Sequence, residues 1–284
     1  MKKVLLTTSA LSLLAGAAAA DVSLSGYGRI GVVYTGLFGV TTTYSRYRLN
    51  LVGSTETDGG LSFGAWTRIQ STSLGTTGGT APGAVTNHRV WVSNGTMTLT
   101  LGNAGGAVAA AAGIWGCGVG FTGSCVDMAD PSFANHTSSS TGGAGPGVVR
   151  VDFALGGANV SVSGGNGNTT EVAANFALGG ANVGIGYAAA ATSPTTWLNV
   201  SFDAGSANVG VRGASNAGGT GWVAHVTYGL GAGAIYAYGG TNLAGSSTYG
   251  AEYSVGLGGG VTASVALWSL GGSSFASAGA QFNF

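Results

Sequence analysis

Residues 44–51 read Tyr-Ser-Arg-Tyr-Arg-Leu-Asn-Leu, and polar and apolar side chains alternate along this stretch. One parity carries the polar side chains of Arg46, Arg48 and Asn50. The other parity carries the apolar side chains of Tyr47, Leu49 and Leu51. A helix would place successive polar positions about 200° apart, whereas a strand places them on one face. The stretch therefore predicts a β-strand with one polar and one apolar face.

The same alternation recurs over most of the chain. Residues 148–153 and 278–284 repeat it, and between them an aromatic residue followed by a Gly-rich turn returns about every 25 residues. Gly-Gly and Gly-Ser pairs favour two-residue hairpin turns, so each period predicts one hairpin. The predicted strands begin near Val22, Thr41, Gly60, Ala84, Thr96, Gly147, Ala158, Thr169, Gly180, Pro194, Ser206, Thr220, Gly233, Ser246, Gly259 and Ser274.

The first 20 residues have the pattern of a secretory signal peptide. Lys2 and Lys3 precede an apolar run over 4–14, and small residues end the segment at Ala20. A membrane-spanning helix needs about 20 apolar residues, so the alternative of a helical anchor is disfavoured. We expect residues 1–20 to be removed and residues 21–284 to form the folded domain.

The composition indicates a membrane protein of a particular kind. Only 6% of the residues are charged, against roughly 25% in typical soluble domains. Basic and acidic residues number nine each, which gives no reason to expect a nucleic-acid partner. After residue 20 no apolar run is long enough for a spanning helix, and only helices and closed barrels span a bilayer. The sequence predicts an all-β protein, a closed transmembrane antiparallel β-barrel of about 16 strands surrounding an aqueous lumen.

One connection is much longer than the rest. Residues 103–146 show no convincing strand pattern, and a loop of this length is usually functional or disordered. It contains Cys117 and Cys125, whose spacing in an exported chain favours one disulfide that closes a small loop. Two unpaired thiols remain the alternative, and a metal site is disfavoured because no second pair of ligands stands nearby.

The arginines are the most informative polar residues. Alternation places five of them on the polar, lumen-facing side of the first four strands: Arg29, Arg46, Arg48, Arg68 and Arg89. A charge on the lipid face costs about 2–4 kcal/mol at the bilayer midplane, which favours the lumen. Asp127 and Asp130 on the long loop would face these arginines if the loop folds inward. Opposed charges across such a constriction would order water and screen solutes.

Two short motifs suggest other functions. Residues 26–31 match a dinucleotide fingerprint and residues 60–64 match a nucleophile elbow, but each lies within a predicted strand and no helix follows. A hydrolase built on a barrel would have to pair Ser62 with His88. A barrel with a plugged lumen and a structural or adhesive role is the other alternative.

Several segments resemble general porins of the alphaproteobacterial type, which are Gram-negative outer-membrane proteins. The resemblance rests on Ser-Gly-Tyr-Gly-Arg-Ile-Gly at 25–31, on residues 45–65 and 89–103, and on the terminal Phe284. It implies a trimer in the outer-membrane lipid, with 103–146 folded into the lumen opposite the arginines. It also implies that the barrel-assembly machinery reads Phe284. The expected function is passive diffusion of ions and small hydrophilic solutes, with no cofactor and no chemical step.

Overall fold

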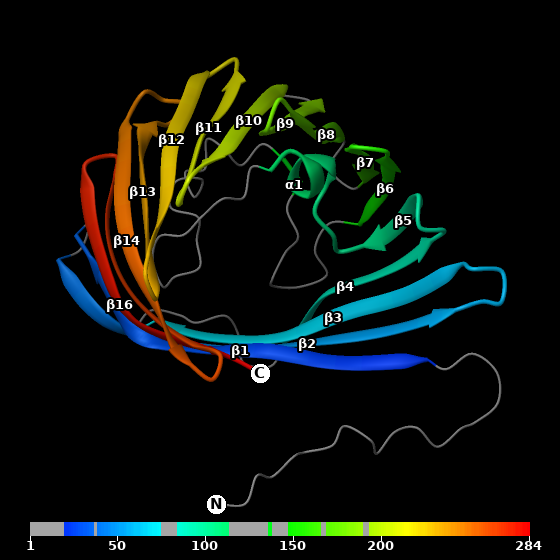
Figure 1. Ribbon diagram of the computed structural model, residues 1–284, viewed down its shortest axis with the longest axis horizontal. Helices are drawn as coiled ribbons and strands as arrows, with labels where there is room; N and C mark the ends of the chain where they lie inside the picture. The colour runs from blue at the N-terminus through cyan, green and yellow to red at the C-terminus, as the bar shows by residue number, and fades with distance from the viewer. Residues whose placement is uncertain are drawn as a thin grey trace, which may run out of the picture.

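The computed structural model is a closed β-barrel with a short helix inside it (Figure 1). The structure describes residues 20–36, 39–74, 84–113, 136–137, 147–165, 169–189 and 193–284. Every strand pairs antiparallel with its neighbours in sequence, and the last strand pairs with the first. No helix among these residues is long and apolar enough to cross a membrane.

The barrel has 16 strands and the lumen contains helix α1 (Ala107–Ala111). The strands are β1 Asp21–Thr35, β2 Val40–Glu56, β3 Ser62–Leu74, β4 Ala84–Ser93, β5 Met97–Gly102, β6 Val148–Leu155, β7 Ala158–Gly165, β8 Thr170–Leu178, β9 Ala181–Ala189, β10 Thr195–Ala204, β11 Ala207–Asn216, β12 Gly219–Leu230, β13 Gly233–Thr241, β14 Ser247–Gly258, β15 Val261–Leu270 and β16 Ser273–Asn283. These bounds confirm the predicted strand number, and each strand begins within about two residues of its predicted start.

Tight glycine turns join the hairpins at one end of the barrel. Leu178 pairs with Ala181 across Gly179 and Gly180, whose φ angles are 57° and 86°. Positive φ at both central positions defines the type I′ turn, whose twist matches that of the flanking strands. The chain thus reverses in two residues, as predicted from the Gly-rich turns of the repeat.

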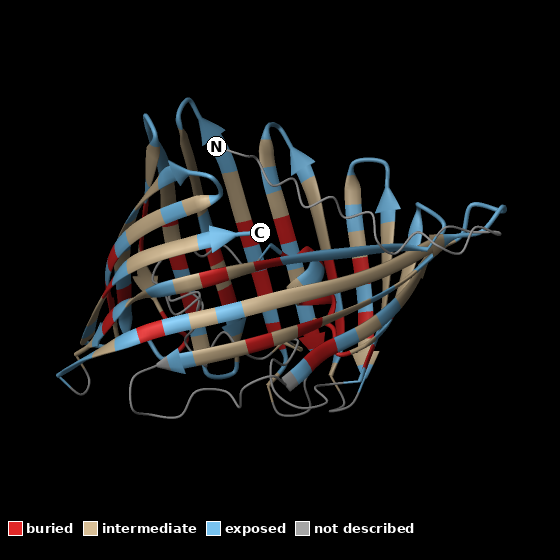
Figure 2. Ribbon diagram, turned by 90° about the horizontal axis from the view of Figure 1, so that it is seen from below, coloured by how far each residue is buried: buried red, intermediate tan, exposed pale blue. Residues whose placement is uncertain are grey.

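Alternation along the strands separates an outer apolar face from an inner polar one. Large hydrophobic side chains such as Ile30, Leu198 and Leu267 are exposed on the outside. Residues at the intervening positions are mostly buried or half-buried and often polar, as the banding of the ribbons shows (Figure 2). An apolar exterior of this kind fits contact with lipid. The closed ladder also satisfies the backbone N–H and C=O groups, which find no water within the bilayer.

The seam between β1 and β16 closes the barrel. Its register runs from Tyr27 opposite Asn283 to Thr35 opposite Phe275, and Gly31 lies directly opposite Gly279. The backbone ladder extends through Phe284, whose N–H donates to the Gly26 carbonyl at 3.0 Å and whose carbonyl accepts from the Gly26 N–H at 2.7 Å. The strands approach closely here, because a Cβ on Gly279 would lie 2.7 Å from the Gly31 Cα and would overlap the Ile30 carbonyl.

We predict that Gly279→Ala weakens the closed barrel. The new methyl group meets backbone atoms, which cannot rotate away, and overpacking of this kind costs about 1–3 kcal/mol. The temperature at which the folded band converts to the unfolded band in gel electrophoresis should therefore fall. Gly164→Ala is the matched control, because a Cβ there meets no atom within 4 Å. Equal conversion temperatures for the two variants would contradict this account of the seam.

Candidate functional site

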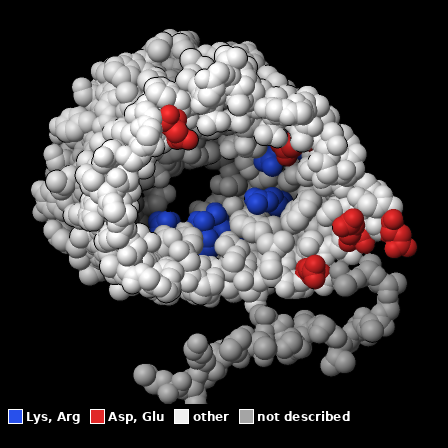
Figure 3. Space-filling model, in the orientation of Figure 1, with Lys and Arg blue, Asp and Glu red and all other residues white. Residues whose placement is uncertain are grey.

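The five predicted arginines come together on one sector of the inner wall. Arg29 on β1 lies directly opposite Arg46 on β2, and Arg48 on β2 lies opposite Gln70 on β3. Arg68 is only 6% exposed. In the view of Figure 3, the blue atoms of the basic residues lie in the hollow of the barrel. Four adjacent strands therefore present a cluster of guanidinium groups to the lumen.

Neighbouring polar side chains orient these guanidinium groups along the wall. The Nε of Arg48 donates to Oε1 of Gln70 at 2.7 Å, and the Nε of Arg29 donates to Oε1 of Gln281 at 2.6 Å. The Nε of Arg46 donates to Oγ1 of Thr72 at 3.1 Å. All three acceptors are uncharged, so these hydrogen bonds fix direction without neutralising the positive charge.

Aromatic rings lie among the arginines and stabilise them. The guanidinium carbons of Arg29 and Arg48 lie 4.7 Å and 5.0 Å from the ring centre of Tyr27. Arg89 lies 4.1 Å from the ring centre of Trp66. The negative face of an aromatic ring attracts a cation within about 6 Å. This attraction offsets part of the repulsion between like charges on neighbouring strands.

A β-bulge between β3 and β4 positions Arg89. Trp66 pairs with Arg89 and Arg68 pairs with Thr86, so two residues of β4 oppose the single residue between them on β3. Within this bulge Asn87 has a φ of 59° and is almost fully buried. A bulge re-aims the following side chains and concentrates at functional sites. The sequence signal for it was Asn87, because Asn tolerates positive φ better than most residues.

The start of the predicted long loop lies against the opposite wall. Helix α1 packs on β7, β8 and β9, and Ala107, Val108 and Ala112 are fully buried (Figure 1). Glycine at position 186 on β9 makes room for this segment, because a Cβ at that position would lie only 3.1 Å from the Ala112 Cβ. The described part of the loop therefore occupies the lumen as predicted. The helix itself was not predicted, because five residues are too few for a periodic signal.

Glu171 on β8 fastens this loop to the wall. It is completely buried, and its Oε2 accepts a hydrogen bond from the Val108 N–H at 2.9 Å. Its Oε1 accepts from the N–H of Thr137, near the other end of the loop. Ser163 on β7 adds a third attachment by accepting from the Ala107 N–H at 2.8 Å. A buried carboxylate is stable when hydrogen-bond donors surround it, so Glu171 and the loop depend on each other.

Other candidate residues are either undescribed or far apart. Asp127, Asp130, Cys117 and Cys125 lie outside the described residues. The hydrolase alternative is not supported, because the structure does not bring Ser62 and His88 together. Ser62 pairs with Ser93, and at about 3.3 Å per residue His88 lies roughly 16 Å further along β4. Within the described ranges, no group of three or more His, Cys, Asp or Glu side chains is placed to hold a metal ion.

A sequence profile described as Gram-negative porin matches residues 7–280. The chain belongs to the Gram-negative porin family. A porin of Fuscovulum blasticum is 33% identical over 150 residues, which cover 50% of this chain and 51% of that protein. The chain thus spans about half the length of this curated relative.

Solved porin structures have the same fold. An engineered variant of Rhodopseudomonas blastica porin superposes with a TM-score of 0.78 at 23% identity, over 93% of this chain and 100% of that one. A triple mutant of the same porin gives 0.78 at 21% identity with the same coverage. The family match agrees with the barrel, and the contacts of the arginines, α1 and Glu171 are observed in this chain's own structure.

We predict that Glu171→Ala loosens the loop inside the lumen. The N–H groups of Val108 and Thr137 lose their acceptor, and a buried unsatisfied donor costs about 1–3 kcal/mol. Single-channel recordings should show larger current fluctuations at a constant voltage. Glu171→Gln should be intermediate, because it keeps one carbonyl acceptor.

Asp203→Asn is the control for this prediction. Asp203 is an exposed carboxylate that accepts from Asn208 at 2.8 Å near a tight turn, away from the loop. Its current trace should match that of the unmodified chain. If the current of Glu171→Ala fluctuates no more than that of the unmodified chain, the loop is held by its apolar packing alone.

Proposed function

We propose that this chain is a general diffusion porin of the outer membrane. Ions and small hydrophilic solutes would cross passively through the water-filled lumen, between the arginine wall and the inserted loop. No step of this process breaks or forms a covalent bond. The supporting observation is the wall of five arginines facing a hollow that the fastened loop narrows (Figure 3).

The charge distribution favours weak preference for anions. Among the described acidic residues of the inner wall, Asp152 is bound to Arg150 at 2.9 Å, Glu171 is bound to backbone N–H groups, and Glu252 lies on β14, outside the β1–β4 sector. The arginines of β1–β4 therefore dominate the potential along their side of the pore. A low-dielectric wall with one sign of charge raises the local concentration of the opposite ion. Asp127 and Asp130 would moderate this preference if they face the cluster.

We predict that the triple replacement of Arg46, Arg48 and Arg68 by Ala shifts ion preference toward cations. The removal of three positive charges from one sector lowers the potential that attracts anions. The measurement is the reversal potential of the pore under a gradient of KCl. Arg212→Ala is the control, because Arg212 is 4% exposed on β11 and lies outside the cluster. An unchanged reversal potential in the triple variant would mean that the arginines do not set the constriction.

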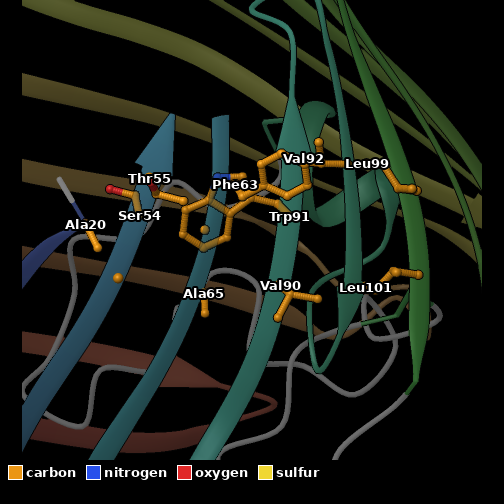
Figure 4. A pocket seen from close by; sticks show the side chains of 12 residues that line it. Ala20, Ser54, Thr55, Phe63, Ala65, Val90, Trp91, Val92, Leu99 and Leu101 are labelled. Atoms are coloured by element: carbon orange, nitrogen blue, oxygen red, sulfur yellow. The ribbon is translucent and has the colours of Figure 1, made fainter. Parts of the chain in front are cut away.

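We also propose that three copies of the chain assemble in the membrane through the outer face of β1–β5. A groove of about 540 Å³ runs across this face, and the apolar side chains of Phe63, Val90 and Leu101 border it (Figure 4). Gly53 and Ala65 form its floor on neighbouring strands. An apolar hollow on this face fits a protruding side chain of a second copy better than it fits mobile lipid chains.

We predict that Ala65→Trp weakens the assembly. The indole fills the groove and leaves no space for the partner. Chemical crosslinking in detergent, read by gel mobility, should show fewer trimers. Ala224→Trp on β12 places the same ring on the outer face far from the groove and should leave the assembly unchanged. Equal trimer yields in both variants would exclude this groove as the contact.

Phe284 has a second proposed role at the seam. Its side chain is 55% exposed and stacks on Tyr47 with ring centres 6.0 Å apart. An accessible terminal aromatic residue on the last strand supports recognition by the barrel-assembly machinery before the seam closes.

A further inference from the structure

A second pocket lies inside the lumen, between helix α1 and the inner face of β5–β8. Its volume is about 470 Å³, within the range of about 300–1,000 Å³ that is usual for small-molecule sites. Gly95 and Thr96 of a tight turn border it, so it lies on the tight-turn side of α1. All of its lining residues belong to the described part of the chain.

The polar wall of this pocket contains a hydrogen-bonded network with no net charge. Asp152 accepts from the Nε of Arg150 at 2.9 Å and from the hydroxyl of Ser161 at 2.5 Å. Arg150 also donates from Nη1 to the Gly105 carbonyl at 2.7 Å, which ties the network to the loop. The two charges neutralise each other and are held by neighbours. The wall therefore favours neither a cation nor an anion.

Two amides complete the wall. Asn159 on β7 and Asn175 on β8 are direct cross-strand partners, so their side chains project from the inner wall side by side. Within the ranges that the structure describes, no hydrogen bond is recorded for either side-chain amide. Each amide offers one carbonyl acceptor and two N–H donors. A pair of such groups matches hydroxyl groups, which both donate and accept.

The opposite side of the pocket is apolar and fixed. Ala110, Ala111 and Gly113 of the α1 segment present methyl and methylene groups to the cavity. Glu171 holds this segment against the wall through the Val108 N–H. The pocket thus combines a fixed apolar surface with a neutral polar one. A sugar ring has the same two characters, with C–H groups on its faces and hydroxyl groups on its rim.

We propose that this pocket binds a neutral, hydroxyl-rich solute of mono- or disaccharide size during its passage through the pore. The proposal rests on the proposed function, because the solute reaches the pocket through an open lumen. The amides of Asn159 and Asn175 hold the hydroxyl groups, and the alanines of α1 cover the ring. Passage of such a solute is therefore saturable, unlike the passage of small ions.

The test uses maltose as the probe on the full mature chain in a planar bilayer. Rising maltose concentrations should reduce the KCl current to a plateau. In the double variant Asn159→Leu with Asn175→Leu, the half-blocking concentration should rise at least tenfold. Asn208→Leu, at a tight turn outside the lumen pocket, should leave it unchanged. If the leucine pair fails to fold, Asn159→Ala with Asn175→Ala replaces it.

Calorimetry of maltose binding in detergent separates the two proposals. A KCl current with no plateau and no heat of binding would overturn the sugar site and leave the porin function standing. Equal half-blocking concentrations in the asparagine variants and the unmodified chain would also overturn it. A barrel without any current would contradict the porin function, and the heat of binding would then decide whether the pocket takes maltose.

Discussion

The bilayer leaves no water to satisfy backbone N–H and C=O groups, so every strand must have a partner on both sides. The chain meets this requirement by pairing β16 with β1, and the ladder continues to the last residue. The close approach of Gly31 and Gly279 is a consequence of this closure. The outward apolar face and the inward polar face are in turn defined only once the ring is complete. Fold and pore thus depend on the same interstrand hydrogen bonds.

The lumen has two walls of different character. The sector of β1–β4 carries guanidinium groups that are oriented by uncharged acceptors and by the rings of Tyr27 and Trp66. The sector of β6–β9 carries small residues that seat α1, together with the buried carboxylate of Glu171. A chain with 6% charged residues therefore places five of its arginines on one sector of the inner wall. The electrostatic potential of a charge is strongest in a confined space with low-dielectric walls, so a few charged residues suffice to set the potential of the lumen.

Local signals predicted most of the fold. Alternation and Gly-Gly turns depend on neighbours in sequence, which is why all 16 strands and the inward parity of the arginines could be predicted. The bulge at Asn87 was missed because it depends on how β3 and β4 align. The contact of Glu171 with Val108 spans 63 residues and has no sequence pattern. Glu171 lies in an ordinary alternating strand. Without the contact to the folded loop, its sequence pattern is that of any water-exposed carboxylate on the inner wall.

Both ends of the loop are attached to the side chain of Glu171, so the segment between residues 108 and 137 can be replaced without moving its attachment points. Val108 and Thr137 meet at Glu171, and Ser163 and Arg150 hold the neighbouring Ala107 and Gly105, so the described ends of the loop are fixed to the wall close together. Doubling the length of a flexible closed loop adds only about 0.6 kcal/mol of entropy cost. Related barrels can therefore exchange or lengthen the segment at little cost in stability. Evolution, or an engineer, can change this segment without redesigning the wall to which its ends are attached.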